Sequence, residues 1–282
     1  MTKIFFVADS FANEVLGGGE LNNHELIILL KQAGKEVLAI KSEHCTPEFL
    51  KDQDGSDFIV GNFIALNPQS KKILENNFNY LIYEHDHKYL KTRDPSSFVD
   101  YMAPPEEIIN KSFYEKASGV ICQSKLHRSV VEKNLKLNNI HSASGNLWSL
   151  HALKNLEKHC DKKKTSKYSI WDSYNPIKRT HLAKAFCIKN NFEAEAIGNL
   201  PYDEFLDRIT NNSHFVFFPE TLETLGRVVV ECRMAGMTVI SNKKVGALSE
   251  EWFKMKGVPL IQEMRKRRGE IPAMVLRILD NQ

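Results

Sequence analysis

Short apolar runs alternate along this chain with longer segments of helical periodicity, and this alternation constrains the fold more than any other feature. Residues 3–8 have the pattern of a buried strand, a glycine run follows, and residues 20–32 have the apolar spacing of a helix. Gly34 would end that helix, and residues 36–40 form the next strand. Strand, glycine loop, helix and strand make a βαβ unit, and such units build parallel sheets.

The same alternation continues to the end of the chain. Further strands are predicted at 58–60, 80–83, 119–122, 168–171, 195–197, 214–218 and 238–240. Residues 161–167 (DKKKTSK) interrupt the series, since they are polar, rich in lysine and without periodicity, as linkers are. We therefore predict an α/β protein of two successive domains, residues 1–160 and 161–282, with ligands bound at the carboxyl ends of the strands.

Composition and charge exclude several classes of protein. Hydrophobic residues make up 42% and charged residues 26%, as in ordinary globular proteins, and a net charge of +3 is too small to predict nucleic-acid binding. The five cysteines are scattered without a CxxC pair, which indicates reduced thiols and no cysteine metal site. The first apolar run is too short for a signal peptide, and no run approaches the roughly 20 residues that span a bilayer. We expect a cytoplasmic protein, at most peripheral to a membrane.

The glycine run is a candidate anion-binding loop. Gly17, Gly18 and Gly19 precede a predicted helix, where backbone N–H groups and the helix dipole favour an anion. A dinucleotide fingerprint would need a glycine where Asn22 stands and an acidic residue where Lys41 follows the second strand. A nicotinamide cofactor is therefore disfavoured, and an ordinary flexible connection remains the alternative.

A second polar cluster, EHDHKY, follows the strand predicted at 80–83. His85 and His87 lie two residues apart and would share one face of a strand, as a pair of metal ligands could. No remote third ligand stands out in the sequence. We therefore favour a histidine that hydrogen-bonds a hydroxyl or phosphate of a substrate.

The segment 218–250 is the most informative part of the chain. A buried strand ends at Pro219, Glu223 lies in the loop that follows, and Glu231 lies eight residues later in the next helix. Glu231 can accept hydrogen bonds from two vicinal ribose hydroxyls, and Glu223 can do the same for the hydroxyls of a sugar. The backbone N–H groups near Gly226 lie at the positive end of the helix, where a diphosphate would be stabilised.

This segment resembles the E-x7-E region of retaining GT-B glycosyltransferases of family 4. The matching positions are a proline, Glu223, Gly226 and Glu231, then AG at 235–236, VI at 239–240 and the stretch 246–250. The glycine run, EHD at 84–86 and GVICQS at 119–124 resemble other parts of the same family. The resemblance touches most of the chain, although only residues 219–250 are specific.

The resemblance implies two Rossmann-like domains that face each other across a cleft (GT-B), with a shortened C-terminal domain. It implies transfer of a hexose from a UDP- or GDP-linked sugar to a glycan, lipid or small-molecule acceptor, with retention and with no metal or other cofactor. Two alternatives stay open: a nucleotide-sugar-binding module with little or no catalysis, and an epimerase of the same fold.

The resemblance also implies roles for particular residues. Glu231 would bind the ribose, Glu223 the transferred sugar, and His85 the donor sugar near the reacting carbon. Lys178 would neutralise the leaving diphosphate, a role that a cation must fill when no metal is bound. The remaining donor-binding positions are Gly18, Gly19, Leu225, Gly226 and Arg227.

Four features depart from the family pattern or remain unassigned. Ser173 stands where the family has an arginine, so we expect Arg179 or Arg227 to supply the second positive charge. The chain ends early, which predicts an abbreviated last helix. The basic runs 162–164 and 265–268 could contact anionic lipid, although a solvated linker and a solvated helix face are the favoured interpretations. Trp148 and Trp171 are expected to pack in the core.

Overall fold

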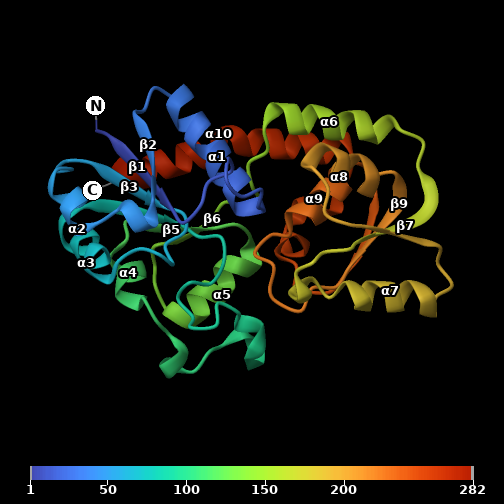
Figure 1. Ribbon diagram of the computed structural model, residues 1–282, viewed down its shortest axis with the longest axis horizontal. Helices are drawn as coiled ribbons and strands as arrows, with labels where there is room; N and C mark the ends of the chain where they lie inside the picture. Colours follow the sequence, from blue (N-terminus) through green and yellow to red (C-terminus); the bar gives the residue numbers. More distant parts are fainter. Residues whose placement is uncertain (1, 281–282) are drawn as a thin grey trace. The chain divides into compact units, whose positions relative to one another are not determined.

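The computed structural model describes residues 2–280, and the chain divides into two compact units (Figure 1). The first unit contains the residues up to Leu147 together with those from Arg267 on, and the second is Trp148–Lys266. The predicted division at residues 160 and 161 therefore falls inside the second unit. The reason is that Trp148 and helix α6 (Leu150–Asp161) bury their apolar side chains in the core of the second unit.

The first unit is built on a six-stranded parallel sheet with strand order β2-β1-β3-β4-β5-β6. Its strands are β1 (Ile4–Ala8), β2 (Val37–Lys41), β3 (Asp57–Val60), β4 (Asn79–Tyr83), β5 (Gly119–Cys122) and β6 (Ile140–Ser142). Its helices are α1 (Gly18–Gln32), α2 (Pro47–Lys51), α3 (Pro68–Asn77), α4 (Lys111–Lys116), α5 (Lys125–Leu135) and the end of α10 (Val258–Asp280). The parallel α/β architecture expected from the sequence is confirmed.

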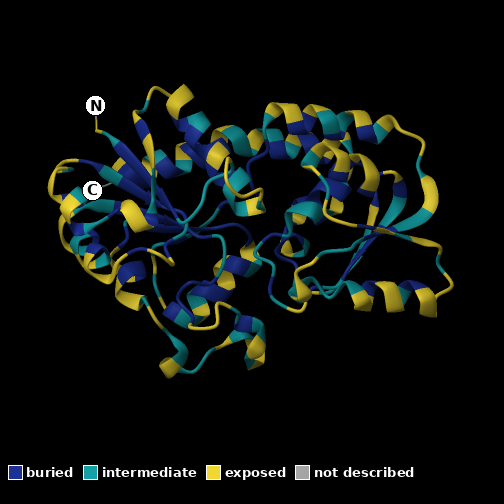
Figure 2. Cartoon of the chain, in the orientation of Figure 1, coloured by how far each residue is buried: buried dark blue, intermediate teal, exposed yellow. Residues whose placement is uncertain are grey.

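Both faces of this sheet are buried, which explains why its strands are nearly continuous apolar runs. Successive residues of one strand enter different clusters: Phe5 and Val7 pack with helices α2 to α5, whereas Phe6 and Ala8 pack with α1 and α10. Figure 2 shows the strands as buried segments between helices whose outer faces are exposed.

The second unit has a smaller parallel sheet of four strands in the order β10-β9-β7-β8. The strands are β7 (Thr165–Trp171), β8 (Ala194–Ile197), β9 (Asn212–Phe217) and β10 (Thr238–Ser241). The helices are α6, α7 (Thr180–Lys189), α8 (Tyr202–Ile209), α9 (Arg227–Met234) and the start of α10. As in the first unit, the loops that follow the strands carry most of the polar residues singled out above.

The last helix, which we expected to be abbreviated, reaches the core of the first unit. Helix α10 has 23 residues, and its final turns place Ile271, Val275 and Ile278 in the core of the first unit. The helix continues because it has apolar side chains at helical spacing to bury there.

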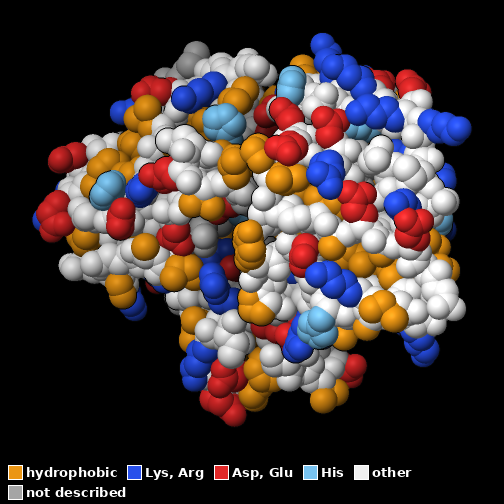
Figure 3. Space-filling model, turned by 45° about the vertical axis from the view of Figure 1, so that its right-hand side comes forward, with side chains coloured by type: hydrophobic (Ala, Val, Ile, Leu, Met, Phe, Trp, Pro, Cys, Tyr) orange, Lys and Arg blue, Asp and Glu red, His pale blue; other side chains and the backbone are white. Residues whose placement is uncertain are grey.

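The basic run at 265–268 is largely paired within the protein. Arg265 contacts Glu157 at 2.8 Å, Arg267 donates to the carbonyl of Ser144 at 3.0 Å, and Arg268 contacts Glu25 at 2.5 Å. On the face seen in Figure 3, basic and acidic side chains are interspersed. No helix within residues 2–280 is both long enough and apolar enough to cross a membrane.

Candidate functional site

The loop between β9 and α9 is fixed against the segment that follows β10. The N–H of Glu223 donates to the carbonyl of Lys244 at 2.8 Å, and the N–H of Gly246 donates to the carbonyl of Glu223 at 2.8 Å. Glu223 and Val245 thus form a short parallel bridge beyond the regular sheet. The backbone position of the Glu223 carboxylate is set by these contacts.

Gly226 begins helix α9 in a conformation that favours glycine. Its φ is +81°, and a Cβ at this position would lie 2.7 Å from Cγ1 of Val245. The neighbouring Leu225 is buried and accepts a hydrogen bond from the N–H of Ala247 at 2.9 Å. The start of α9 is therefore held close to the Glu223 loop. The N-cap residue is a glycine, so no N-cap side chain covers the first N–H groups of the helix.

Glu231 is 1% exposed and is held through one of its two carboxylate oxygens. Its Oε1 accepts hydrogen bonds from Trp148 Nε1 at 2.9 Å, from the Tyr202 hydroxyl at 2.6 Å and from Arg227 Nε at 3.0 Å. The Arg227 guanidinium also lies 4.5 Å from the centre of the Trp148 ring. Trp148 is a core residue, as expected, but its contact with Glu231 was not predicted.

Lys178 and Glu223 form an ion pair. The resemblance assigns Lys178 to the diphosphate of the donor and Glu223 to its sugar. The Nζ of Lys178 lies 2.5 Å from Oε1 of Glu223 and 5.5 Å from the centre of the Trp171 ring. Lys178 ends a short 3-10 helix, η5 (Pro176–Lys178), which begins where the side chain of Asn175 accepts from the N–H of Ile177 at 3.2 Å.

The two candidates for a second positive charge are also paired with glutamates. Arg179 Nε donates to Oε2 of Glu220 at 2.7 Å, in a largely exposed pair, whereas Arg227 is bound to the buried Glu231. Ser173 is occupied within its own loop, since its N–H donates to Thr180 Oγ1 at 3.3 Å and its Oγ accepts from the backbone of Asn175.

In the first unit the glycine run lies beside His85. A Cβ on Gly19 would lie 3.5 Å from Cγ of His85, which is an ordinary van der Waals distance, so the two residues are direct neighbours. With the amides oriented as here, Nε2–H of His85 donates to Asn23 Oδ1 at 2.5 Å and Nδ1 accepts from the Gln123 side chain. Enclosure of the ring and the nearby Lys88 ammonium lower the pKa of His85 to about 3, so its imidazole is neutral at pH 7.

A carboxylate of the protein itself lies at the start of helix α1. The Glu20 side chain turns back so that its Oε2 would be 2.1 Å from a Cβ on Gly17. Burial raises the pKa of this carboxyl, and the Asp9 carboxylate acts in the same direction. A phosphate bound at Gly18 or Gly19 would therefore have to displace Glu20 or meet it in its protonated form.

The EHDHKY segment forms a buried network of charges rather than a pair of histidine ligands. Glu84 accepts hydrogen bonds from Lys88 and Tyr114, and Lys88 also contacts Asp86 at 2.9 Å. His87 lies apart from His85, with its Nδ1 3.1 Å from the Tyr89 hydroxyl. Within residues 2–280, no three His, Cys, Asp or Glu side chains converge as a metal site would require.

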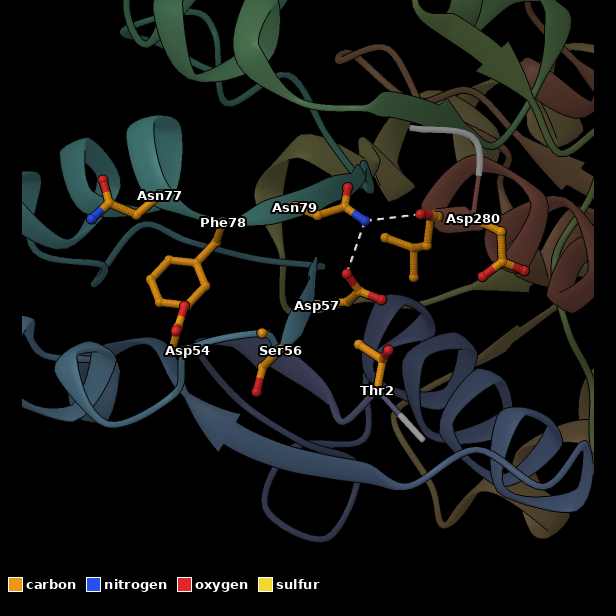
Figure 4. Close-up of a pocket in the computed structure, with 10 residues that line it drawn as sticks. Thr2, Asp54, Ser56, Asp57, Asn77, Phe78, Asn79 and Asp280 are labelled. Carbon is orange, nitrogen blue, oxygen red and sulfur yellow. Dashed lines mark hydrogen bonds between the residues drawn. The ribbon is translucent and has the colours of Figure 1, made fainter.

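A pocket at the other end of the first sheet contains none of the predicted residues (Figure 4). It lies at the amino ends of β3 and β4, where Asn79 Nδ2 donates to Asp57 Oδ1 at 2.8 Å and to the carbonyl of Leu279 at 2.9 Å. In each unit, by contrast, the predicted residues lie in or next to the loops at the carboxyl strand ends, where ligands of open parallel sheets bind.

The structure resembles solved glycosyltransferases over essentially its whole length, although no protein-family model and no curated protein matches the sequence. A glycosyltransferase from Rickettsia africae has a TM-score of 0.61 and 13% identity, with 99% of this chain and 93% of that chain covered. The lipopolysaccharide outer core galactosyltransferase WaaB has a TM-score of 0.54 and 11% identity, with 98% and 95% covered.

A third structure of similar fold was solved with ligands. Anabaena Alr3699/HepE in complex with UDP and glucose has a TM-score of 0.53 and 12% identity, and the match covers 100% of this chain and 98% of that chain. These identities are too low to transfer an activity, but the shared fold extends over both units. The chain has the fold of the GT-B glycosyltransferases.

Proposed function

We propose that this protein is a glycosyltransferase that moves a hexose from a UDP- or GDP-linked donor to a glycan, lipid or small-molecule acceptor, with retention and without a metal. The observation that carries the proposal is the environment of Glu231. Three donors fix one oxygen of this buried carboxylate. The second oxygen, Oε2, is then the one left to accept from the hydroxyls of a ribose. Solved proteins of the same fold include one in complex with UDP and glucose, which agrees with such a ligand.

In this proposal the second unit binds the donor. The N–H groups of Leu225, Gly226 and Arg227 would hold the diphosphate at the start of α9. Lys178 would stabilise the negative charge that develops on the departing diphosphate. Glu223 would accept hydrogen bonds from the sugar hydroxyls.

The first unit would supply His85 and the glycine run. With its pKa near 3, His85 would contact the donor sugar as a neutral group and not as a general acid or base at pH 7. Retention means that the acceptor oxygen arrives on the face from which the diphosphate leaves. NMR of the product anomer tests this point, since an inverted linkage would contradict it.

Glutamine in place of Glu231 is expected to abolish the thermal response to nucleotide. In wild-type protein, one of UDP, GDP or ADP at about 100 times its Kd should stabilise the fold by roughly 2.7 kcal/mol. Glu231→Gln keeps an acceptor for Trp148 and Tyr202 but removes the charge that two ribose hydroxyls would share. Glu204→Gln, an exposed position on α8, is the control. Stabilisation by NAD alone, or by no nucleotide, would contradict the proposed function.

Methionine in place of Lys178 is expected to slow sugar transfer by about 10²–10³-fold, because one preorganised charge at the leaving group is lost. The measurement is release of the nucleoside diphosphate from the donor that stabilises the protein. Lys184→Met removes an exposed lysine that pairs with Asp172, and should leave the rate unchanged. Equal rates in wild type and Lys178→Met would remove Lys178 from the mechanism.

A binding module without turnover is the second candidate, because Lys178 and Arg179 are both neutralised by carboxylates and Ser173 replaces the expected arginine. Tight donor binding with no diphosphate release for any acceptor would favour it. An epimerase of the same fold would instead change the sugar of the donor and release no diphosphate.

A further inference from the structure

In the second unit, two groups that the proposed function gives to different parts of the donor are bonded to each other. Lys178, assigned to the diphosphate, and Glu223, assigned to the sugar, form an ion pair of 2.5 Å. Their side chains are only 17% and 16% exposed, so water screens the pair less than it would a surface pair. A ligand that binds between them must replace the partner of each.

Both members of the pair stand on anchored backbone. Glu223 is held by its exchange of hydrogen bonds with Lys244 and Gly246. The turn that carries Lys178 is joined to the same loop, since the N–H of Glu220 donates to the carbonyl of Ile177 at 2.9 Å. The backbone positions of both members of the pair are therefore fixed relative to each other.

Ligands differ in how well they replace the two partners of this ion pair. A nucleoside diphosphate offers anionic oxygens to Lys178, but it leaves the Glu223 carboxylate without its cation and close to further negative charge. A nucleotide sugar offers the same anionic oxygens to Lys178 and hydroxyl donors to Glu223. Leaving one partially buried charge without a partner is costly, whereas replacing both partners at once is not.

We propose that the Lys178–Glu223 ion pair makes the site discriminate the intact nucleotide sugar from the spent nucleoside diphosphate, with Glu223 as the residue that disfavours the product. The inference rests on the proposed function of this site and adds a specificity role to it. Its consequence is weak inhibition by the nucleoside diphosphate that the reaction releases.

The test is isothermal titration of UDP, GDP, UDP-glucose and GDP-mannose into wild type and Glu223→Gln. For the base that the protein binds, Glu223→Gln is expected to bind the free diphosphate about 10-fold more tightly, equivalent to about 1.4 kcal/mol. The preference for the sugar conjugate over the diphosphate should fall by at least the same factor. Glu223→Asp retains the charge and should keep the weak binding of the diphosphate.

Asp172→Asn is the matched control. Asp172 pairs with Lys184 in the same unit, but the side chains are 44% and 45% exposed and neither has a role in the proposed site, so this variant should change diphosphate affinity by less than about 2-fold. Unfolding temperatures of all variants check that the fold is retained. Unchanged or weaker diphosphate binding by Glu223→Gln would overturn this inference while the proposed function stands. Binding of no diphosphate to wild type or to Glu223→Gln would overturn both.

Discussion

Lowering the pH from 7 to 5 is expected to destabilise the first unit by about 2 kcal/mol through His127, and His87 adds a loss of the same sign. The cause lies in two fully buried histidines, His87 and His127. Burial lowers the pKa of His127 to about 3 and that of His87 well below its usual value. In the unfolded chain both would bind protons with a pKa near 6.5.

The sign follows from proton linkage. Between pH 6.5 and 3 the unfolded state binds protons that the folded state does not, so stability is lost as the pH falls through 6.5. At pH 5 His127 accounts for about 2 kcal/mol, and the lowered pKa of His87 acts in the same direction. For Asp86, burial acts to raise the pKa, but the Lys88 ammonium and Arg93 outweigh it and lower the value to about 2. Its contribution is lost only at still lower pH, in the same direction.

Local contacts explain why His127 resists protonation. Its Nδ1 accepts from the backbone N–H of Gln123 at 3.2 Å, and its Nε2–H donates to the carbonyl of Asp86 at 2.9 Å. A proton on Nδ1 would break the first of these bonds and bring a charge near Lys88. His87 packs against the His127 ring, with centroids 4.9 Å apart, so charging either ring disfavours charging the other.

The two units can be followed separately during acid titration. All three tryptophans, Trp148, Trp171 and Trp252, lie in the second unit, so their fluorescence reports on that unit alone. Hydrogen exchange of peptides from β4 and β5 reports on the first unit. As the pH is lowered, the first unit should unfold before the second. His127→Gln should reduce the number of protons taken up on acid unfolding, given by the slope of the free energy of unfolding against pH, by about one. His24→Gln, at an exposed position, should leave this slope unchanged. Equal protection of β4 and β5 at pH 7 and pH 5 would contradict the prediction.

The strands of the first unit were predictable because their residues are apolar on both faces. The run at 119–122, for example, coincides with β5, where all four residues are buried. Strand β6 escaped prediction because its three residues include a histidine and a serine at half-buried positions. The domain boundary was misplaced because periodicity shows that α6 is amphipathic, but it does not show which core receives the apolar face.

The sequence groups candidate site residues only where they lie close together along the chain. Glu223, Gly226 and Glu231 follow one strand, so one motif contains them all. The residues that fix Glu231 lie 29 and 83 positions away, at Tyr202 and Trp148, and no local pattern relates them to it. The pairing of Lys178 with Glu223 likewise spans 45 residues and depends on how two loops meet.

Alanine in place of Glu231 is expected to destabilise the second unit by about 3–5 kcal/mol. The substitution leaves Arg227, whose side chain is only 10% exposed, without its carboxylate. It also removes the acceptor of the Trp148 indole N–H in a fully buried position, and an unpaired buried donor adds to the cost. Urea unfolding followed by tryptophan fluorescence measures the loss, since the three tryptophans all belong to this unit.

Two further variants separate the structural role of Glu231 from its proposed role in binding. Glu231→Gln retains a carbonyl oxygen for Trp148 and Tyr202, so it should lose roughly half as much stability as alanine. The double variant Arg227→Met/Glu231→Gln also removes the Arg227 charge and should recover part of the stability that Glu231→Gln loses.

Wild-type stability in Glu231→Ala would show that the three hydrogen bonds contribute nothing in solution. A loss of nucleotide response in Glu231→Ala alone would not identify a ribose contact, because a destabilised unit binds poorly for other reasons. The same loss in a Glu231→Gln variant that unfolds cooperatively, with recovery of stability but not of the nucleotide response in the double variant, would identify the Glu231 charge as a ligand contact.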